Sequence, residues 1–322
     1  MVPIVEITAN ELDVEKFIKD KTTEISEAAG DDTAINALSG GVDSSTVTLL
    51  GHKALGEKLK TYFIDNGLMR KDEPQEVVSI FSKMGVNVEI IDARKEFFAA
   101  LKDIDDPEKK REAITQTFYK KVFGRLVKES GARHLLQGTI LTDVDETVAG
   151  IKRQHNVFEQ LGIDPQETFG YKIIEPLLQL RKDGVRKVAE GLGLPEVIFN
   201  RPPFPGPALA ARVIGAVTPE DVELVRQATV IMEEVLGSVN SFQNMAILHK
   251  DRVTGMRNNM REFGRQIEIR SWESTDARTA TPMRVDYETL FYLADRITKE
   301  VQGVVSVTYH IAKKPPSTME AV

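Results

Sequence analysis

Cysteine is absent from the sequence. A chain without thiols has no sulfur nucleophile, no disulfide relay, no persulfide carrier and no cysteine-ligated iron–sulfur or zinc site. Any mechanism that this protein uses must therefore run without sulfur chemistry.

Signals for a membrane or a nucleic-acid partner are also lacking. The stretch 1–17 has neither the basic region nor the apolar region of a secretion signal, and no later run is as long as a membrane span. The 42 Lys and Arg residues are outnumbered by 49 Asp and Glu residues, whereas general nucleic-acid binding needs an excess of basic side chains. We therefore expect a cytoplasmic protein with no membrane or nucleic-acid partner.

Length and composition indicate a folded globular protein. The 322 residues exceed the usual size of one compact domain, which predicts about two domains. Apolar residues make up 41% and charged residues 28% of the chain, and neither a low-complexity tract nor a short repeat occurs.

The first two-thirds of the chain alternates between two kinds of segment. Those with the composition of buried strands are 33–39, 59–65, 86–92 and 134–139. Those with helical patterns are 13–28, 45–55, 72–85, 93–129 and a short helix from 183 to about 195. Strands separated by helices imply parallel pairing, so we predict an α/β fold with a doubly wound parallel sheet.

The pattern changes after residue 200. Four prolines fall within residues 201–207 and exclude a regular helix or a central strand, which makes this stretch the predicted domain boundary. Beyond it we expect two helices and three strands, at 219–236, 286–301, 242–249, 265–273 and 304–312. The predicted domains are 1–200 and a smaller α+β domain, 201–322. Within the first, the polar and aperiodic stretch 141–170 is interpreted as an active-site lid.

The stretch ALSGGVDSSTVTLL, residues 37–50, carries the strongest local signal. A glycine-rich turn between a strand and a helix presents backbone N–H groups to an anion, and the helix dipole adds to the attraction. Gly40 and Gly41 permit close approach, and three serines supply hydroxyl donors. An ordinary helix-capping turn is the alternative interpretation of the glycine pair.

Spacing excludes the two commonest phosphate loops. The mononucleotide loop needs a lysine after its last glycine, but the first lysine after this turn is Lys53. The dinucleotide fingerprint needs a third glycine that is missing here. An acidic residue inside an anion site, Asp43, is explained if it holds a Mg²⁺ ion that bridges phosphates.

The motif SGGVDSS, directly after a strand and before a helix, resembles the loop signature of the ATP pyrophosphatase superfamily. Enzymes of that superfamily cleave ATP between the α and β phosphates and adenylylate an acceptor oxygen. The resemblance implies an adenine nucleotide alpha hydrolase-like fold, ATP as a substrate and Mg²⁺ as a cofactor.

The remainder resembles the synthetase part of the GMP synthase family over nearly the whole chain. The matching stretches, in the family's order, are FIDNGLMRKDE, DPEKKREAI, LLQGTILTDVDET, IKRQHNV, IIEPL, DGVRKVAEGLGLP, NRPPFPGPALAARVIG and KKPPSTME. The resemblance implies adenylylation of the 2-oxygen of xanthosine monophosphate (XMP) with release of pyrophosphate. Ammonia then displaces AMP to give GMP.

Motif and resemblance together assign the ATP half of the site. The predicted ATP- and pyrophosphate-binding residues are Ser39, Gly40, Gly41, Val42, Asp43, Ser44, Ser45, Asp65, Gly138 and Thr139. The last three end strands, where an α/β sheet places its ligand contacts. A loop cap is the alternative role for Asp65.

The predicted catalytic residues are Asp43, Asp143, Glu146 and Lys152, with Asp43 and Asp143 as metal ligands. Asp143 and Glu146 would share a face of a helix, and could hold a second Mg²⁺ or polarise the reacting groups. Lys152 matches the family's lid lysine and would offset charge on the leaving pyrophosphate. The lid charges that we interpret as solvated are Asp145, Arg153 and His155.

The resemblance also implies an acceptor site. Its predicted residues are Arg111, Lys314, Thr318 and Glu320. The double proline after Lys314 would stiffen the tail and reduce the entropy lost on binding. A frayed terminus is the alternative.

The resemblance further bears on partners. Two-domain members of the family carry an amino-terminal glutaminase with a cysteine nucleophile, and this chain has no cysteine and no room for that domain before Ser39. Ammonia would therefore arrive free or from a separate glutaminase subunit. The family's carboxyl-terminal domain forms dimers, so a homodimer is expected, with Trp272, Phe291 and Tyr292 either at its interface or in the core.

Several positions depart from the family pattern. Ala208 stands where glycine is usual in the family. The φ angle at this position in the structure will show whether the backbone there needs the conformational freedom of glycine. His310 replaces the usual aspartate, Ala321 and Val322 replace Trp-Glu, and the lid lacks the usual second histidine and glycine pair. Two alternative functions follow: an enzyme that adenylylates a different acceptor, and a nucleotide-binding protein without turnover.

Overall fold

The structure is a computed structural model that describes residues 4–148, 170–200, 204–237, 239, 241–275 and 278–321. The chain forms two compact units, which are described separately below. Unit 1 consists of Met1–Asp65, Glu73–Asp92 and Phe118–Arg201, and unit 2 of Asn66–Asp72, Ala93–Thr117 and Pro202–Val322. Within the described part of the chain, every helix is too short or too polar to cross a bilayer.

Five parallel strands form the sheet of unit 1. They are β1 (Ala34–Ala37), β2 (Leu59–Asp65), β3 (Val88–Asp92), β4 (His134–Leu136) and β5 (Lys172–Ile174). Their spatial order is β3-β2-β1-β4-β5. The chain moves outward from β1 to β3 and then returns to add β4 and β5 on the other side, which confirms the doubly wound α/β fold. This reversal sets the carboxyl ends of β1 and β4 side by side, where such sheets bind ligands.

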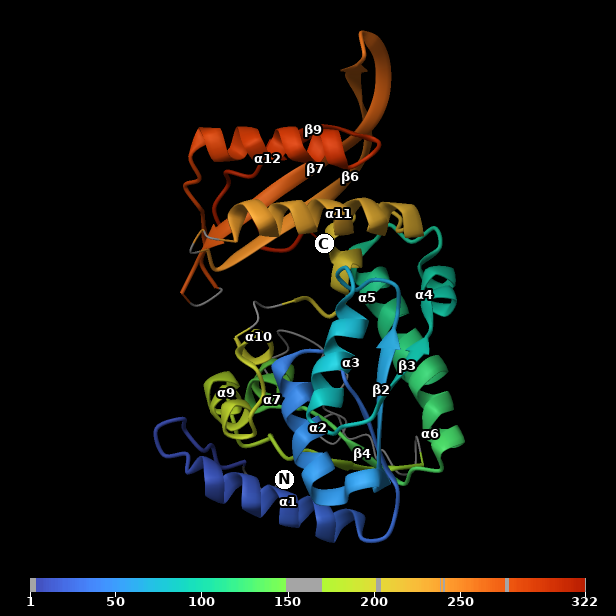
Figure 1. The fold of residues 1–322 in the computed structure, drawn as a ribbon, viewed down its shortest axis with the longest axis vertical. Coiled ribbons are helices and arrows are strands. Elements are labelled where there is room, and N and C mark those ends of the chain that lie inside the picture. Colours follow the sequence, from blue (N-terminus) through green and yellow to red (C-terminus); the bar gives the residue numbers. More distant parts are fainter. Residues whose placement is uncertain are drawn as a thin grey trace. The chain divides into compact units, whose positions relative to one another are not determined.

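Helices flank this sheet (Figure 1). Those of unit 1 are α1 (Val14–Ala29), α2 (Val42–Leu55), α3 (Glu73–Lys83), α6 (Gly124–Ser130), α7 (Leu141–Val148), α9 (Lys182–Gly191) and α10 (Glu196–Phe199). α2 packs against α1, α9 and α10, and α3 packs on β2 and β3. Most residues of α2 are buried, as expected for a helix that is covered on several sides.

Some elements in the first 200 residues differ from the sequence-based expectation. The continuous helical stretch predicted over 93–129 is divided into α4 (Arg94–Leu101), α5 (Pro107–Gln116), the π-helical turn η2 (Thr117–Phe123) and α6. The start of the predicted lid forms α7, and 149–169 lie outside the described residues. The edge strand β5 was not predicted, because three residues are too few to display an alternating pattern.

Unit 2 has the predicted α+β character. Its sheet contains β6 (Gln243–Arg257), β7 (Met260–Glu273), β8 (Thr281–Pro282) and β9 (Val304–Tyr309). β7 pairs antiparallel with β6 and β8 and parallel with β9. The helix α11 (Pro219–Leu236) packs on β6, α12 (Tyr287–Glu300) packs on β9, and the two helices pack on each other (Figure 1).

The carboxyl-terminal tail belongs to the core of unit 2. Met319 packs with Met245, Ile247, Trp272 and Ala280, all of them buried. Trp272 is fully buried and therefore lies in the core rather than on a surface. The described part of the tail is packed rather than frayed.

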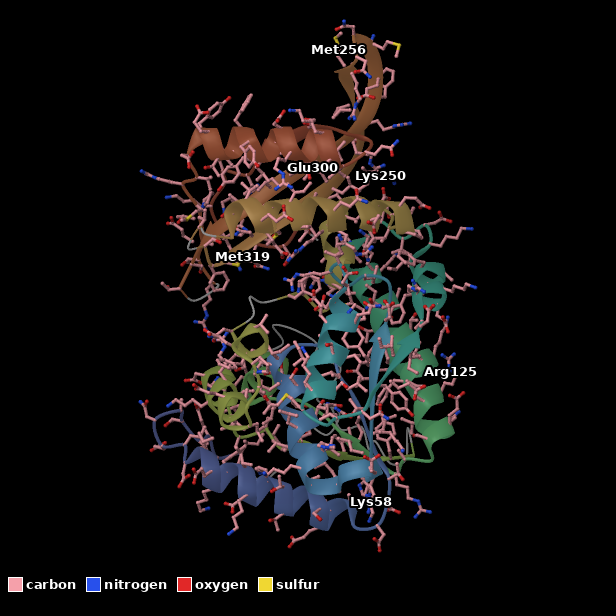
Figure 2. The ribbon with its side chains drawn as sticks, viewed as in Figure 1. Lys58, Arg125, Lys250, Met256, Glu300 and Met319 are labelled. Carbon is pink, nitrogen blue, oxygen red and sulfur yellow. The ribbon has the colours of Figure 1, made fainter. Side chains whose placement is uncertain are left out.

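The hairpin of β6 and β7 ends in a two-residue turn. Asn258 and Asn259 both have positive φ, 51° and 60°, as a type I′ turn requires and asparagine tolerates. Met256 lies at the far end of this hairpin (Figure 2), and both Met256 and Met260 are exposed.

Candidate functional site

The glycine-rich loop joins β1 to α2 at the predicted place. Ser39 N donates to Ser44 Oγ at 3.2 Å, the two serine hydroxyls lie 2.9 Å apart, and Gly41 N lies 3.4 Å from Ser39 Oγ. Gly40 has φ of +79°, so the turn uses the left-handed region that glycine favours. Backbone N–H groups and hydroxyls are thus gathered at the amino end of α2, as an anion cradle requires.

A buried network of three polar side chains, Asn36, Thr48 and Thr61, holds the elements on either side of this loop in place. Asn36 on β1 donates from Nδ2 to Thr48 Oγ1 of α2 at 2.6 Å and accepts from Thr61 Oγ1 of β2 at 2.7 Å. Both Asn36 and Thr48 are fully buried. Because fully satisfied buried networks are rigid, β1, β2 and α2 hold the loop in one arrangement.

Asp43 lies in the first turn of α2 and forms an ion pair that the sequence did not predict. Its Oδ2 accepts a hydrogen bond from Lys182 Nζ at 2.6 Å, and the two side chains are 27% and 47% exposed. Lys182 is the first residue of α9, which packs on α2. The pair places a cation beside the anion cradle.

The other carboxylate oxygen of Asp43 fits a metal ion. Asp43 Oδ1 is buried and has no hydrogen-bond partner among the described residues. A carboxylate oxygen is the ligand type that Mg²⁺ prefers, and Mg²⁺ commonly takes one or two carboxylates together with substrate phosphates and water. No group of three or more His, Cys, Asp or Glu side chains able to hold a metal occurs in the described part of the chain, so phosphate and water would have to complete the coordination.

The residues that follow β4 pack against the loop. A Cβ on Gly138 would lie 3.1 Å from the backbone C of Asp43 and 3.2 Å from Ser44 N, closer than side chains normally approach. Glycine at this position therefore lets the two backbones meet. Thr139 is fully buried, and its hydroxyl is committed to Glu175, whose Oε1 also lies 3.4 Å from Gln137 Nε2. Glu175 is a partly buried partner that the sequence did not identify.

The described acidic residues of α7 already have partners. Asp143 Oδ2 accepts from Ile140 N at 3.0 Å, the arrangement in which an acidic residue in the first turn caps its own helix. Asp145 forms an ion pair with Arg181 at 2.8 Å, and Arg181 also pairs with Glu6 at 3.0 Å. The predicted positions that lie outside the description are the Glu146 side chain, Lys152, Arg153 and His155.

Asp65 lies at the carboxyl end of β2, opposite Asp92 at the end of β3. It is partly buried, and the next residue, Asn66, belongs to unit 2. Asn66 Oδ1 accepts from Leu68 N at 2.9 Å, so Asn66 caps the tight turn after β2.

All four predicted acceptor residues lie in unit 2. Gln243 Nε2 donates to Glu320 Oε1 at 3.0 Å, and the buried Arg212 lies 3.5 Å from Glu320 Oε2. Thr318 Oγ1 donates to the Glu320 backbone carbonyl at 2.7 Å. These contacts hold the end of the chain in a defined conformation.

Lys314 lies at a cavity of about 670 Å³. Its backbone N and O pair with Ala280 at 2.9 and 3.1 Å, which fixes the lysine relative to the end of β7 and β8. The cavity is lined by five hydroxyl residues, two lysines, one glutamate and three apolar residues: Ser241, Phe242, Glu273, Ser274, Thr275, Thr279, Ala280, Thr281, Lys313, Lys314 and Pro315. Hydroxyl and ammonium donors thus outnumber the single carboxylate, which suits a polar anionic molecule.

Arg111 lies on α5, which is part of unit 2. Its neighbour Lys110 is buried and donates from Nζ to the Val213 carbonyl at 2.8 Å. Burial lowers the pKa of Lys110 to about 8. Arg111 is 44% exposed, and Val213 directly follows Arg212. Lys110 therefore ties the helix that carries Arg111 to the segment that contacts Glu320.

Ala208 has a φ of +53°. It follows a proline-rich turn in which Ala208 N donates to the Pro205 carbonyl at 2.8 Å, and it begins the short helix η4 (Ala208–Arg212). The position where the family has glycine does therefore adopt a positive φ, which alanine occupies at a cost.

Comparison with known proteins defines the class of enzyme. The NAD synthase family model matches residues 12–124, and the model described as GMP synthase C terminal domain matches residues 231–321. The first match covers β1, the glycine-rich loop and α2, and together with the five-strand parallel sheet it places unit 1 in the ATP pyrophosphatase class.

Similarity to curated relatives extends over nearly the whole chain. The B subunit of GMP synthase (glutamine-hydrolyzing) from Archaeoglobus fulgidus is 47% identical over 96% of this chain and 99% of its own length. The protein of the same name from Pyrococcus furiosus is 46% identical over 95% of this chain and 97% of its own, and that from Halobacterium salinarum is 43% identical over 96% and 99%. The chain belongs to this family of GMP synthase B subunits.

Proposed function

We propose that the chain is the synthetase subunit of a GMP synthase, using ATP to adenylylate the 2-oxygen of XMP. The oxygen attacks the α-phosphorus, pyrophosphate leaves, and ammonia then attacks C2 and displaces AMP, which yields GMP. The observation that carries the proposal is the identity of 47% with a GMP synthase B subunit over 96% of the chain, with the SGGVDSS loop intact.

The loop residues Ser39 to Ser45 would receive the β and γ phosphates of ATP. Their N–H groups, their hydroxyls and the helix dipole of α2 all favour negative charge at this point. Asp43, through its buried Oδ1, would hold Mg²⁺, and that ion would supply positive charge beside the phosphates. Lys182 would turn from Asp43 to a phosphate oxygen and add a second cation.

Residues near the loop would complete the ATP half. Gly138 and Thr139 would contribute their backbone next to Ser44, and Asp65 would face the nucleotide from the end of β2. Asp143 and Glu146 would contribute carboxylates from α7, and Lys152 would offset charge on the leaving pyrophosphate. Asp143 would be a second candidate ligand for the metal ion, and its Oδ2 also accepts a hydrogen bond from Ile140 N.

The acceptor would bind to the domain 201–322 together with Arg111. The hydroxyl-rich cavity at Lys314 supports a site for the phosphate and ribose of XMP. Glu320 and Thr318, held by Gln243 and by the tail itself, would contact the nucleotide next to it. The cationic partners for the phosphate would be Arg111 and Lys314.

Ammonia would come from a separate glutaminase subunit, since the relatives are named as the B subunit of a glutamine-hydrolyzing enzyme and this chain has no cysteine. A cytoplasmic homodimer is part of the proposal. The aromatic side chains Tyr287, Phe291 and Tyr292 on α12 are 75%, 63% and 56% exposed, which supports a protein contact there. Sedimentation of the wild type and of Phe291→Glu would test it.

The decisive assay supplies ATP, Mg²⁺, ammonium and XMP and follows pyrophosphate, AMP and GMP. We expect the three products in equal amounts. Pyrophosphate release with a different acceptor but not with XMP would contradict the proposal and indicate another adenylylating enzyme. Tight ATP binding with no turnover would indicate a nucleotide-binding protein.

A further inference from the structure

Four side chains meet on the sheet of unit 2. Glu268 of β7 lies with Oε2 at 2.7 Å from His249 Nε2 of β6, and with Oε1 at 2.6 Å from Arg270 Nε. The same Oε1 lies 3.0 Å from Nδ1 of His310, directly after β9. Glu268 and Arg270 are each only 8% exposed. One buried carboxylate is thus shared by nitrogen atoms from three neighbouring strands or their ends.

Arg270 connects this carboxylate to the tail. Its Nη1 donates to the backbone carbonyls of Thr318, Met319 and Glu320 at 3.0, 3.2 and 3.3 Å. Three successive carbonyls therefore converge on one guanidinium nitrogen, so the path of the tail depends on where Arg270 is held. Thr318 and Glu320 are two of the proposed acceptor-binding residues.

His310 forms a second connection to the same segment. Its Nε2 lies 3.1 Å from Ser317 Oγ, and its ring centroid lies 5.3 Å from that of the buried Trp272. The tail is thereby held at its beginning through Ser317 and at its end through Arg270.

The charges explain why this arrangement needs Glu268. A buried guanidinium is costly unless it has a counter-charge, and Glu268 supplies it to Arg270. Burial would raise the pKa of Glu268, but hydrogen bonds from His249 and Arg270 hold it at about 2, so the carboxylate is ionised at neutral pH.

We propose that Glu268 is a positioning residue for the acceptor site, which acts through Arg270 and His310 to hold Thr318 and Glu320 where the acceptor nucleotide binds. The inference rests on the proposed function, because it takes XMP as the acceptor. It concerns affinity for XMP and not the ATP half of the reaction, whose proposed loop and metal residues lie in unit 1.

The substitution Glu268→Gln tests this role, because it keeps the side-chain shape and removes the charge. We expect the KM for XMP, and the Kd for XMP measured by calorimetry, to rise about tenfold, as for loss of a charged hydrogen bond. The KM for ATP, and kcat at saturating XMP, should stay within about twofold.

A matched control sharpens the test. Glu262→Gln makes the same change on the same strand, where the carboxylate pairs with Arg257 at 2.9 Å, and it should leave the KM for XMP unchanged.

Two results would overturn the inference: an unchanged KM for XMP in a folded Glu268→Gln variant, or equal rises in the KM for XMP and ATP. If circular dichroism finds Glu268→Gln unfolded, Glu268→Asp replaces it and must raise the KM for XMP alone. Failure of the wild type to bind or convert XMP would instead contradict the proposed function, so the two failures are distinguishable.

Discussion

Lys182 Nζ lies 2.6 Å from Asp43 Oδ2, joining the first residue of α9 to the first turn of α2. The pair neutralises the one acidic side chain of the loop while the other carboxylate oxygen stays without a hydrogen bond among the described residues. A cation from α9 and a carboxylate oxygen from α2 thus lie together at the glycine-rich loop. In the proposed function, Lys182 would take the place of the lysine that other phosphate loops carry within their motif.

Asp43→Asn should abolish turnover chiefly by removing magnesium binding. The amide keeps the size of the side chain but lacks the negative charge that a Mg²⁺ ligand needs. Pyrophosphate release measured over a range of Mg²⁺ concentrations should be lost throughout or recover only at high Mg²⁺. Wild-type activity at low Mg²⁺ would refute the metal role of Asp43.

Lys182→Met should reduce the rate of pyrophosphate release about tenfold to hundredfold, because a cation that stabilises charge on the leaving group is lost. Lys187→Met is the matched control, since Lys187 is on the same helix but its Nζ contacts the Ala9 carbonyl at 2.6 Å. The control should keep the wild-type rate within about twofold. Equal rates in both variants would exclude a role for Lys182 in the reaction.

Ala208→Gly should change the free energy of unfolding by less than about 1 kcal/mol. Relief of the left-handed strain contributes about 1–2 kcal/mol, and it is offset by about 0.5–1 kcal/mol of added chain entropy and about 0.8 kcal/mol for the buried methyl. Ala208→Val should destabilise by roughly 2 kcal/mol or more, because a β-branched residue fits poorly at positive φ. Urea denaturation would measure both, and a neutral Ala208→Val would contradict the observed backbone geometry.

Acid stability should depend on Glu268. Its pKa of about 2 in the folded protein is below the ordinary value of 4.5, so its stabilising effect is complete above pH 4.5 and is lost as the pH falls toward 2. A shift of this size corresponds to roughly 3 kcal/mol at neutral pH. The difference in unfolding free energy between the wild type and Glu268→Gln should therefore shrink between pH 4.5 and 2. Parallel curves over this range would contradict the assignment.

Much of the fold could be predicted because its signals are local. β2 has the predicted bounds, Leu59–Asp65, and α11 also has them, Pro219–Leu236, where Thr218 caps the helix and proline fills its first position. The elements that were missed have weak local signals. β5 is too short for a periodic pattern, and α7 is a polar helix within a stretch that resembles a loop.

The candidate site was predictable where its residues are consecutive and not where folding brings them together. Residues 39–45 form one motif, so the sequence alone predicts both the turn and its proposed role as an anion cradle. Lys182 is 139 positions from Asp43, and Glu175 is 36 positions from Thr139, so only the packing of α9 and β5 reveals these partners. His310 was singled out in the sequence, but its contact with Glu268 depends on strand register.

Neither of the two units is formed by one continuous stretch of the chain. The backbone passes from one unit to the other five times, at residues 65/66, 72/73, 92/93, 117/118 and 201/202. Splitting the gene or cleaving the chain near residue 200 would leave Arg111 and Lys110 on a fragment separate from Arg212 and Glu320. The two units are therefore interleaved along one polypeptide, and neither corresponds to a single contiguous segment of the gene.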